Sequence, residues 1–176
     1  RLLNKPDLEI AQIRQEYFSA FGPAAGAVER YCGYWETYGV ENVMRFLELF
    51  QNPFFGYRYR AYPLKAHKAY PADVFVPAVA LLDEAMTQAR ADPLSEYAER
   101  VEFLRAGLKH AQLTVGLAGI FDGKKNVPKA RLKEGRDALA ELVRFRKEHQ
   151  QMFFSDLLWV TSYWERPCWN VDVLAE

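Results

Sequence analysis

The sequence lacks most of the features that reveal a protein's activity directly. Its 176 residues include only two cysteines and three histidines, and 23 basic side chains balance 23 acidic ones. Because net charge is absent, binding to nucleic acid through bulk positive charge is disfavoured. No apolar run reaches the roughly 18 residues of a membrane span, and no signal-peptide pattern is seen. Half of the residues are apolar and 15% are aromatic, which excludes disorder as the main state.

Local catalytic and cofactor motifs are also missing. The sequence has no GxSxG elbow, phosphate loop, GxGxxG or HExxH. His67, His110 and His149 lie far apart in the sequence, and none has a second ligand at helical spacing, so we expect no metal site and no cofactor. Paired carboxylates could hydrolyse a glycoside, but acids on amphipathic helices are too common to predict a catalytic centre. The candidates are Glu36, Glu41, Asp156 and Glu165.

The two cysteines leave two interpretations open. Cys32 and Cys168 are far apart and form no CxxC pair. They are either free buried thiols or one long-range disulfide, which would imply an oxidising compartment. The spacing does not decide between them.

Apolar residues follow a helical period along most of the chain, so we expect an all-α fold of five to seven helices. The spacing predicts helices that end at Gly22, at Gly39 and at Phe50, a helical hairpin over 71–91 and 94–121, and a further helix from about Lys129 that Pro167 ends. The stripes of the hairpin favour antiparallel packing of its two helices. Residues 51–70, rich in Tyr and Arg and broken by Pro and Gly, are expected to form an irregular connection within a single domain.

Aromatic residues supply the candidate binding positions. A flat exposed ring beside carboxylates or amides can hold the apolar face of a sugar, whereas a buried ring is a core or interface anchor. Both interpretations apply to Trp35, Tyr38, Trp159, Trp164 and Trp169. The basic and aromatic stretch Tyr57, Arg58, Tyr59 and Arg60 could stack on nucleic acid, but zero net charge favours a loop that docks against a neighbouring domain.

Two segments resemble a known family. The stretch Tyr17–Ala25 (YFSAFGPAA), together with Tyr31 and the stretch Tyr34–Glu36, is similar to the C-terminal helical region of bacterial glycoside-hydrolase-like proteins of unknown function. In these proteins that region follows an α-glucuronidase-type N-terminal domain. Weaker matches lie at Leu81–Ala85 and Arg100–Arg105.

The resemblance implies a helical domain appended to a catalytic-type barrel of an exported protein, periplasmic or extracellular. The domain would contact the barrel, form a dimer surface or line the substrate cleft, and it would carry no catalytic residue of its own. Because the chain begins with Arg1 rather than Met, we expect a fragment of a larger protein.

The sequence therefore predicts a non-catalytic helical domain of a carbohydrate-active protein. Its expected partner is an upstream barrel or a second copy, with carbohydrate as a possible ligand. The alternative is a free-standing protein-interaction module without a carbohydrate role, which uses its apolar C-terminal segment. Neither nucleic acid nor a membrane is expected as a partner.

Overall fold

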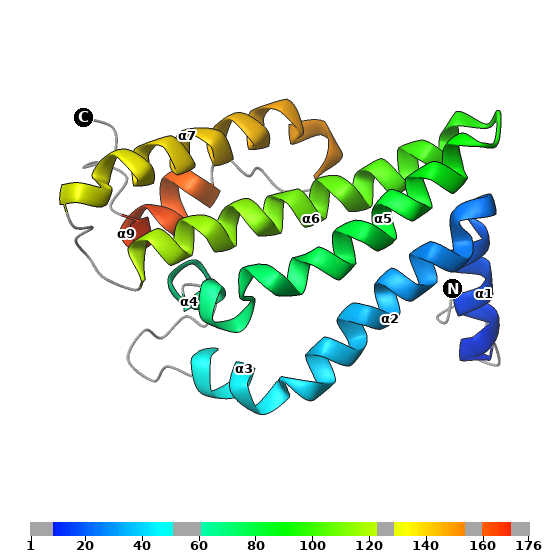
Figure 1. The fold of residues 1–176 in the computed structure, drawn as a ribbon, viewed down its shortest axis with the longest axis horizontal. Helices are drawn as coiled ribbons and strands as arrows, with labels where there is room; N and C mark the ends of the chain where they lie inside the picture. Colours follow the sequence, from blue (N-terminus) through cyan, green and yellow to red (C-terminus); the bar gives the residue numbers. More distant parts are fainter. Residues whose placement is uncertain (1–8, 51–60, 123–128, 154–159, 170–176) are drawn as a thin grey trace. The chain divides into compact units, whose positions relative to one another are not determined.

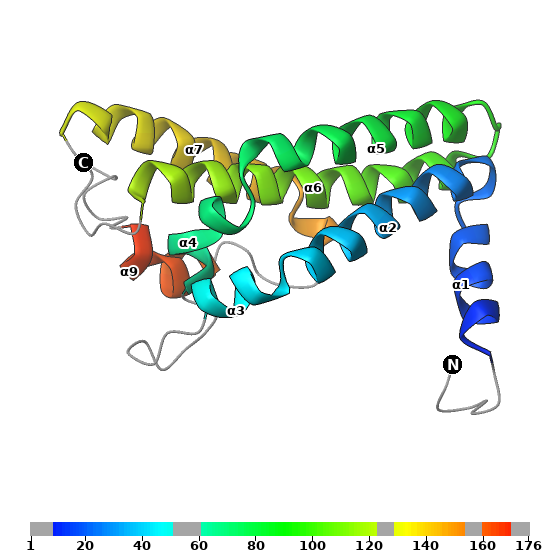
Figure 2. The ribbon, with the colours of Figure 1, turned by 60° about the horizontal axis from the view of Figure 1, so that its bottom comes forward.

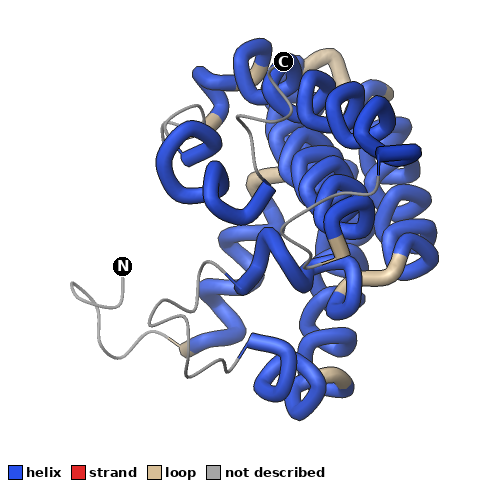
Figure 3. The backbone as a smooth tube through the Cα atoms, turned by 90° about the vertical axis from the view of Figure 1, so that its left-hand side faces the viewer, coloured by secondary structure: helices blue, strands red, loops and turns tan. Residues whose placement is uncertain are grey.

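The computed structural model describes residues 9–50, 61–122, 129–153 and 160–169, and the regular structure in these ranges is entirely helical (Figures 1 and 3). Its longer helices are α1 (Ile10–Ser19), α2 (Ala25–Glu41), α3 (Val43–Phe50), α4 (Ala61–Ala69), α5 (Phe75–Arg90), α6 (Ser95–Phe121) and α7 (Leu132–Glu148). A π-helical turn over Val160–Glu165 leads into the short helix α9 (Arg166–Trp169). The all-α prediction is confirmed.

None of the helices in the described ranges is both long and apolar enough to cross a membrane. The chain divides into two compact units. One consists of Arg1–Tyr38 and Pro77–Arg105, and the other of Gly39–Val76 and Ala106–Glu176.

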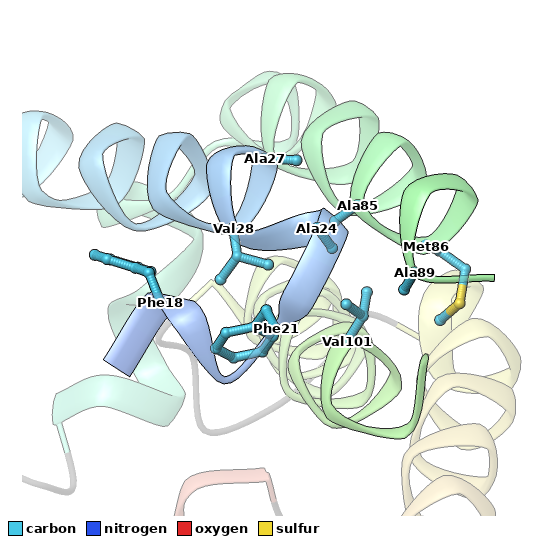
Figure 4. Packing of buried hydrophobic residues seen from close by; sticks show 9 residues of the cluster. All are labelled: Phe18, Phe21, Ala24, Ala27, Val28, Ala85, Met86, Ala89 and Val101. Carbon is cyan, nitrogen blue, oxygen red and sulfur yellow. The ribbon is translucent and has the colours of Figure 1, made fainter. Parts of the chain in front are cut away.

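The first unit has a core built largely from small side chains. Phe18 and Phe21 meet Val28 of α2 and Val101 of α6, while alanines of α2 and α5 fill the space between the helices (Figure 4). Alanines let helix axes approach closely, because no long side chain separates them. The buried members of this cluster are Phe18, Phe21, Ala24, Ala27, Val28, Ala85, Met86, Ala89 and Val101.

The predicted end of the first helix at Gly22 is confirmed, and Gly22 has two physical reasons to be glycine. Its φ of +53° is rarely adopted by residues with a side chain. A Cβ atom there would also lie 2.5 Å from a ring carbon of Tyr97. The guanidinium of Arg100 donates to the carbonyl oxygen of Ala20 just before this turn. The most specific part of the family resemblance is therefore a tight joint between α1 and α2.

The helical hairpin predicted over 71–91 and 94–121 is also confirmed. Helices α5 and α6 run antiparallel (Figure 1). Within the first unit, Arg105 Nη2 lies 3.0 Å from Asp83 Oδ1 across the pair. On α6 the predicted stripe residues Val101, Leu108 and Val115 are all buried. The 4–3 spacing of apolar residues was thus sufficient to locate the packed face.

The second unit has a core of larger side chains. Its buried members are Leu117, Ile120, Phe121, Leu139, Leu142, Cys168 and Trp169, contributed by α6, α7 and α9. Leu64 of α4 packs against the same cluster. Helix α4 thus connects this core to α3, which packs beside α4 (Figure 2).

Four sequence predictions need correction. Residues 61–69 form helix α4 rather than an irregular connection, because Pro63 stands in the first turn, where its missing N–H removes no intrahelical bond. Helix α2 runs through Gly39 to Glu41, since an α-helical glycine costs only about 1 kcal/mol. Apolar spacing predicts a buried face of Ile10, Ile13, Tyr17 and Phe21 for the first helix. This face is wrong, because Ile10 and Tyr17 are 73% and 51% exposed and Phe18 is the buried residue of α1.

The fourth correction concerns Pro167. It does not end the C-terminal helix, because α9 starts at Arg166 and proline in a first turn interrupts no α-helical hydrogen bond. The apolar segment 152–164 is expected to be buried deeply or against something absent from this chain; its residues 154–159 lie outside the described residues, and Thr161 is buried. The single-domain organisation stays a prediction.

Candidate functional site

An exposed apolar stripe runs along the end of α2 and the length of α3. Val40, Val43, Met44 and Leu47 are between 43% and 74% exposed. Val43, Met44 and Leu47 lie within α3, and Val40 lies in the last turn of α2, which Asn42 separates from α3. We refer to these four residues as the α3 stripe.

Helix α3 is held by its opposite face. Phe46 and Phe50 point to α4, where their rings lie 5.3 Å from that of Tyr70 and 6.2 Å from that of Tyr62. Lys65 Nζ donates to the Leu49 carbonyl oxygen over 2.9 Å. These aromatic contacts bury one apolar face of α3, whereas the α3 stripe remains exposed.

The second unit also contains a buried ionic network. Arg146 of α7 is 1% exposed, and its guanidinium binds both carboxylate oxygens of Glu165, at 2.5 and 3.0 Å. It also donates to Thr161 Oγ1 and, over 3.0 Å, to His110 Nε2. The guanidinium of Arg146 therefore joins α7 to the π turn through Glu165 and Thr161, and to α6 through His110.

The histidine of this network is neutral. Burial, and secondarily the charge of Arg146, lower the pKa of His110 to about 4. Its ring also stacks on Phe145 and contacts Phe153. A neutral Nε2 accepts the hydrogen bond that Arg146 donates, and the arrangement is a hydrogen-bonded structural network.

A second polar cluster ends α6. Asp122 has a positive φ of 45°, and its carboxylate lies 3.0 Å from His67 Nε2 and 3.2 Å from Lys68 Nζ. Hydrogen bonds from His67 and then Lys68 lower the pKa of Asp122. Arg131 donates to two carbonyl oxygens of the last turn of α6. Cations at a helix C-terminus interact favourably with its dipole, so this cluster is a helix cap.

The predicted sugar platform on α2 is partly accessible. Trp35 makes edge-on contacts with Tyr31, Tyr34 and Tyr38, with ring centroids between 5.2 and 6.5 Å apart. Trp35 and Tyr38 are both half-buried, and Glu36 next to them is exposed. Direct stacking of a sugar on this cluster stays a prediction.

Trp169 contradicts the platform interpretation. Its side chain is 0% exposed, and its Nε1 donates to the Pro63 carbonyl oxygen over 3.1 Å. The ring is a core anchor that joins α9 to α4, which is the alternative that the sequence left open. Trp159, the side chain of Trp164, and Tyr57, Arg58, Tyr59 and Arg60 lie outside the described residues.

The candidate carboxylates do not form a catalytic pair among the described residues. Glu36 lies 3.5 Å from Arg14, and Glu165 is committed to Arg146. Glu41 is exposed on α2, and Asp156 lies outside the described residues. An open groove of about 450 Å³ beside α1 contains Arg14, whose guanidinium is 5.6 Å from the Phe18 ring centroid and is already paired with acids.

The potential metal ligands and the cysteines of the described ranges do not cluster. No group of three or more potential metal ligands occurs there. Cys32 and Cys168 are both free, the first half-buried and the second buried. Burial raises the pKa of the Cys32 thiol. These thiols therefore match the free-cysteine interpretation in this structure.

Sequence reasoning missed both the α3 stripe and the Arg146 network. It placed Val43, Phe46, Leu47 and Phe50 on a single side, whereas the structure divides them between α4 and solvent. A signal for Arg146 was present, because it follows Leu139 and Leu142 at steps of 3 and 4 and so occupies an apolar position of α7.

No family model, no curated protein and no solved structure matches this chain.

Proposed function

We propose that this chain is a non-catalytic helical domain that docks onto another folded protein domain through the α3 stripe. The observation that carries the proposal is the exposure of Val43, Met44 and Leu47 on α3, a helix whose other face is already packed, and of Val40 at the adjoining end of α2. Single exposed apolar residues are ordinary on protein surfaces, but an ordered row of them marks an interaction site. Glu165 and Trp169 are both buried, so the proposal gives them a packing role.

The resemblance of Tyr17–Ala25 to glycoside-hydrolase-like proteins supports a partner for this docking. We infer that the domain served by this chain is a catalytic-type barrel of a carbohydrate-active protein. The helical domain supports the barrel, its dimerisation or its substrate cleft, and it carries out no chemistry itself. The alternative is a free-standing module that binds another protein through the same stripe and has no carbohydrate-related role.

The first experiment measures whether the α3 stripe binds a hydrophobic probe in the isolated chain. The neutral variant M44Q/L47Q keeps helix propensity and charge while it removes apolar surface. We expect the unaltered chain to bind a hydrophobic fluorescent dye and this variant to lose most of the signal. The control variant V76Q/L94Q changes two apolar residues that are 67% and 56% exposed elsewhere, and it should retain the signal.

The second experiment tests docking in the natural context. The polypeptide encoded by the complete reading frame is compared with this chain by hydrogen exchange of the α3 amides. Stronger protection of α3 in the longer polypeptide, abolished by M44Q/L47Q, supports docking on a neighbouring domain. Equal exchange in both, or a reading frame that starts directly before Arg1, rules out the neighbouring-domain form and leaves only the free-standing module.

Direct sugar binding by Trp35 and Tyr38 is a second candidate function, favoured by their half-buried rings, which contact each other edge-on. Uronic-acid oligosaccharides are titrated while the indole N–H signals of the tryptophans are followed by NMR. A shift confined to Trp35 supports this function. No shift across a broad glycan panel eliminates it.

A further inference from the structure

The chain passes from one compact unit to the other at three places, after residues 38, 76 and 105. The first passage lies within α2 and the third within α6, and both helices continue through it. The second lies in the first turn of α5. The members of each core cluster described above come from one unit only. Units with cores of their own can move as bodies if the segments that join them bend.

A glycine without a packing role follows the passage in α6. Gly107 is the second residue after it, and a Cβ atom at this position would meet no atom within 4 Å. The φ of Gly107 also lies outside the left-handed region that favours glycine. Neither close packing nor backbone conformation therefore requires a glycine here. What this glycine changes is the stiffness of the helix, because only proline is a poorer helix former.

Side chains on the two sides of Gly107 are paired with different units. Before it, Arg105 Nη2 lies 3.0 Å from Asp83 Oδ1 in the first unit. After it, Lys109 Nζ lies 3.6 Å from Glu141 Oε1 in the second unit. Helix α6 is thus held to the first unit up to Arg105 and to the second from Lys109 onward, with Gly107 midway between the two ion pairs.

The other two passages also contain a residue that weakens a helical backbone. Gly39 is the first residue after the passage in α2, and a Cβ atom there would meet no atom within 4 Å. Directly before it, the Tyr38 ring packs edge-on against Trp35 of the first unit, with 5.9 Å between ring centroids. At the start of α5, Pro77 has no N–H to donate to the preceding turn.

We propose that Gly39 and Gly107 are hinges about which the two units change their mutual orientation. The motion bends α2 and α6 at these glycines and leaves the core of each unit intact. Hinge motions in proteins are absorbed by a few residues of this kind, often small ones. The α3 stripe belongs entirely to the second unit, so the hinge and the docking function are tested separately.

Residual dipolar couplings of the backbone amides test the hinge in the whole chain, measured by NMR in one dilute alignment medium. The couplings of each unit are fitted to the structure of that unit alone, which gives one alignment magnitude for each. Two units of a rigid body have equal magnitudes, whereas hinge motion on the microsecond to millisecond scale lowers one relative to the other. We expect the ratio of the smaller to the larger magnitude to be below one.

The variant G39A/G107A should move this ratio toward one, because alanine is the best helix former and stiffens both helices at the passages. The matched control G33A/G116A changes one glycine of the same two helices away from the passages, where a Cβ atom also meets nothing within 4 Å. Both double variants should raise the urea midpoint by a similar amount. A difference between them in alignment therefore reports hinge motion and not stability.

Three results decide the proposal. A ratio that G39A/G107A raises and G33A/G116A leaves unchanged supports the hinges. Equal magnitudes in the unaltered chain overturn them, because the two units are then one rigid body. A ratio that neither variant changes, or that both change alike, overturns them as well, because the motion then does not arise at these glycines.

Discussion

Removing one partner of the buried Arg146–Glu165 pair should destabilise the second unit far more than removing a comparable pair on the surface. Arg146 is 1% exposed and Glu165 6%, and the two share a two-pronged contact. E165Q leaves a buried guanidinium without its counter-charge, while R146M leaves a buried carboxylate. Each single change is expected to cost about 3–5 kcal/mol in free energy of unfolding.

The double variant R146M/E165L has a different expected result. It removes both charges and replaces them with apolar groups, and such replacements are often close to neutral. His110 then keeps no arginine donor, but its Nε2 is only one acceptor, so we expect a loss of at most about 2 kcal/mol. The double variant should therefore be more stable than either single variant, with a coupling energy of several kcal/mol.

Urea unfolding followed by far-UV circular dichroism measures these differences. The matched control is E84Q, because Glu84 forms a 2.5 Å ion pair with Arg30 in which both side chains are about half exposed. We expect E84Q to change the free energy of unfolding very little, because exposed ion pairs contribute little. If E165Q costs no more than E84Q, or if the double variant loses as much as the two singles together, burial does not set the strength of this pair and the reasoning fails.

Three further predictions follow from single features. The pKa of His110 is lowered to about 4 from its ordinary 6.5, so its neutral state stabilises the fold above pH 6.5. The free energy of unfolding should therefore fall by up to about 3 kcal/mol as the pH drops from 6.5 to 4. Urea unfolding at a series of pH values measures this fall, and H110Q should reduce it. G22A should cost about 1–2 kcal/mol from its φ of +53° alone and more from the Tyr97 contact, as thermal unfolding will show; G22A/Y97A should recover only the contact part. W169F loses the hydrogen bond to Pro63 and should cost about 1–3 kcal/mol, whereas no change in stability would mean that the ring is not an anchor.

The positions of the packed helices could be predicted from apolar spacing. The stripe of α6 contains Val101, Leu108 and Val115, and all three are buried. Helix α3 also ends at the predicted residue, Phe50. Periodicity works here because each of these helices buries one face against a neighbour in the same unit.

Sequence-based prediction of secondary structure and burial failed at positions where a tertiary contact outweighs the local preference of the residues. The prolines and tyrosines of 61–69 indicated an irregular segment, yet the rings of Tyr62 and Tyr70 pack on α3 and hold a helix there. Trp169 looked equally suited to a core or to a sugar platform, since the sequence does not show which surface covers a ring. Only its contact with Pro63, distant in the sequence, decides the matter.

Helices α7 and α3 both depart from a simple amphipathic pattern, and the two departures have opposite meanings. Helix α7 carries an arginine at an apolar position, and Glu165, Thr161 and His110 satisfy it inside the same unit. A complete internal network needs no further partner. Helix α3 carries apolar residues on the face that should be polar, and they remain exposed although its other face is packed. A helix that is apolar on two sides is normally covered on both, so the α3 stripe, and not the buried charge cluster, is the surface on which the docking proposal rests.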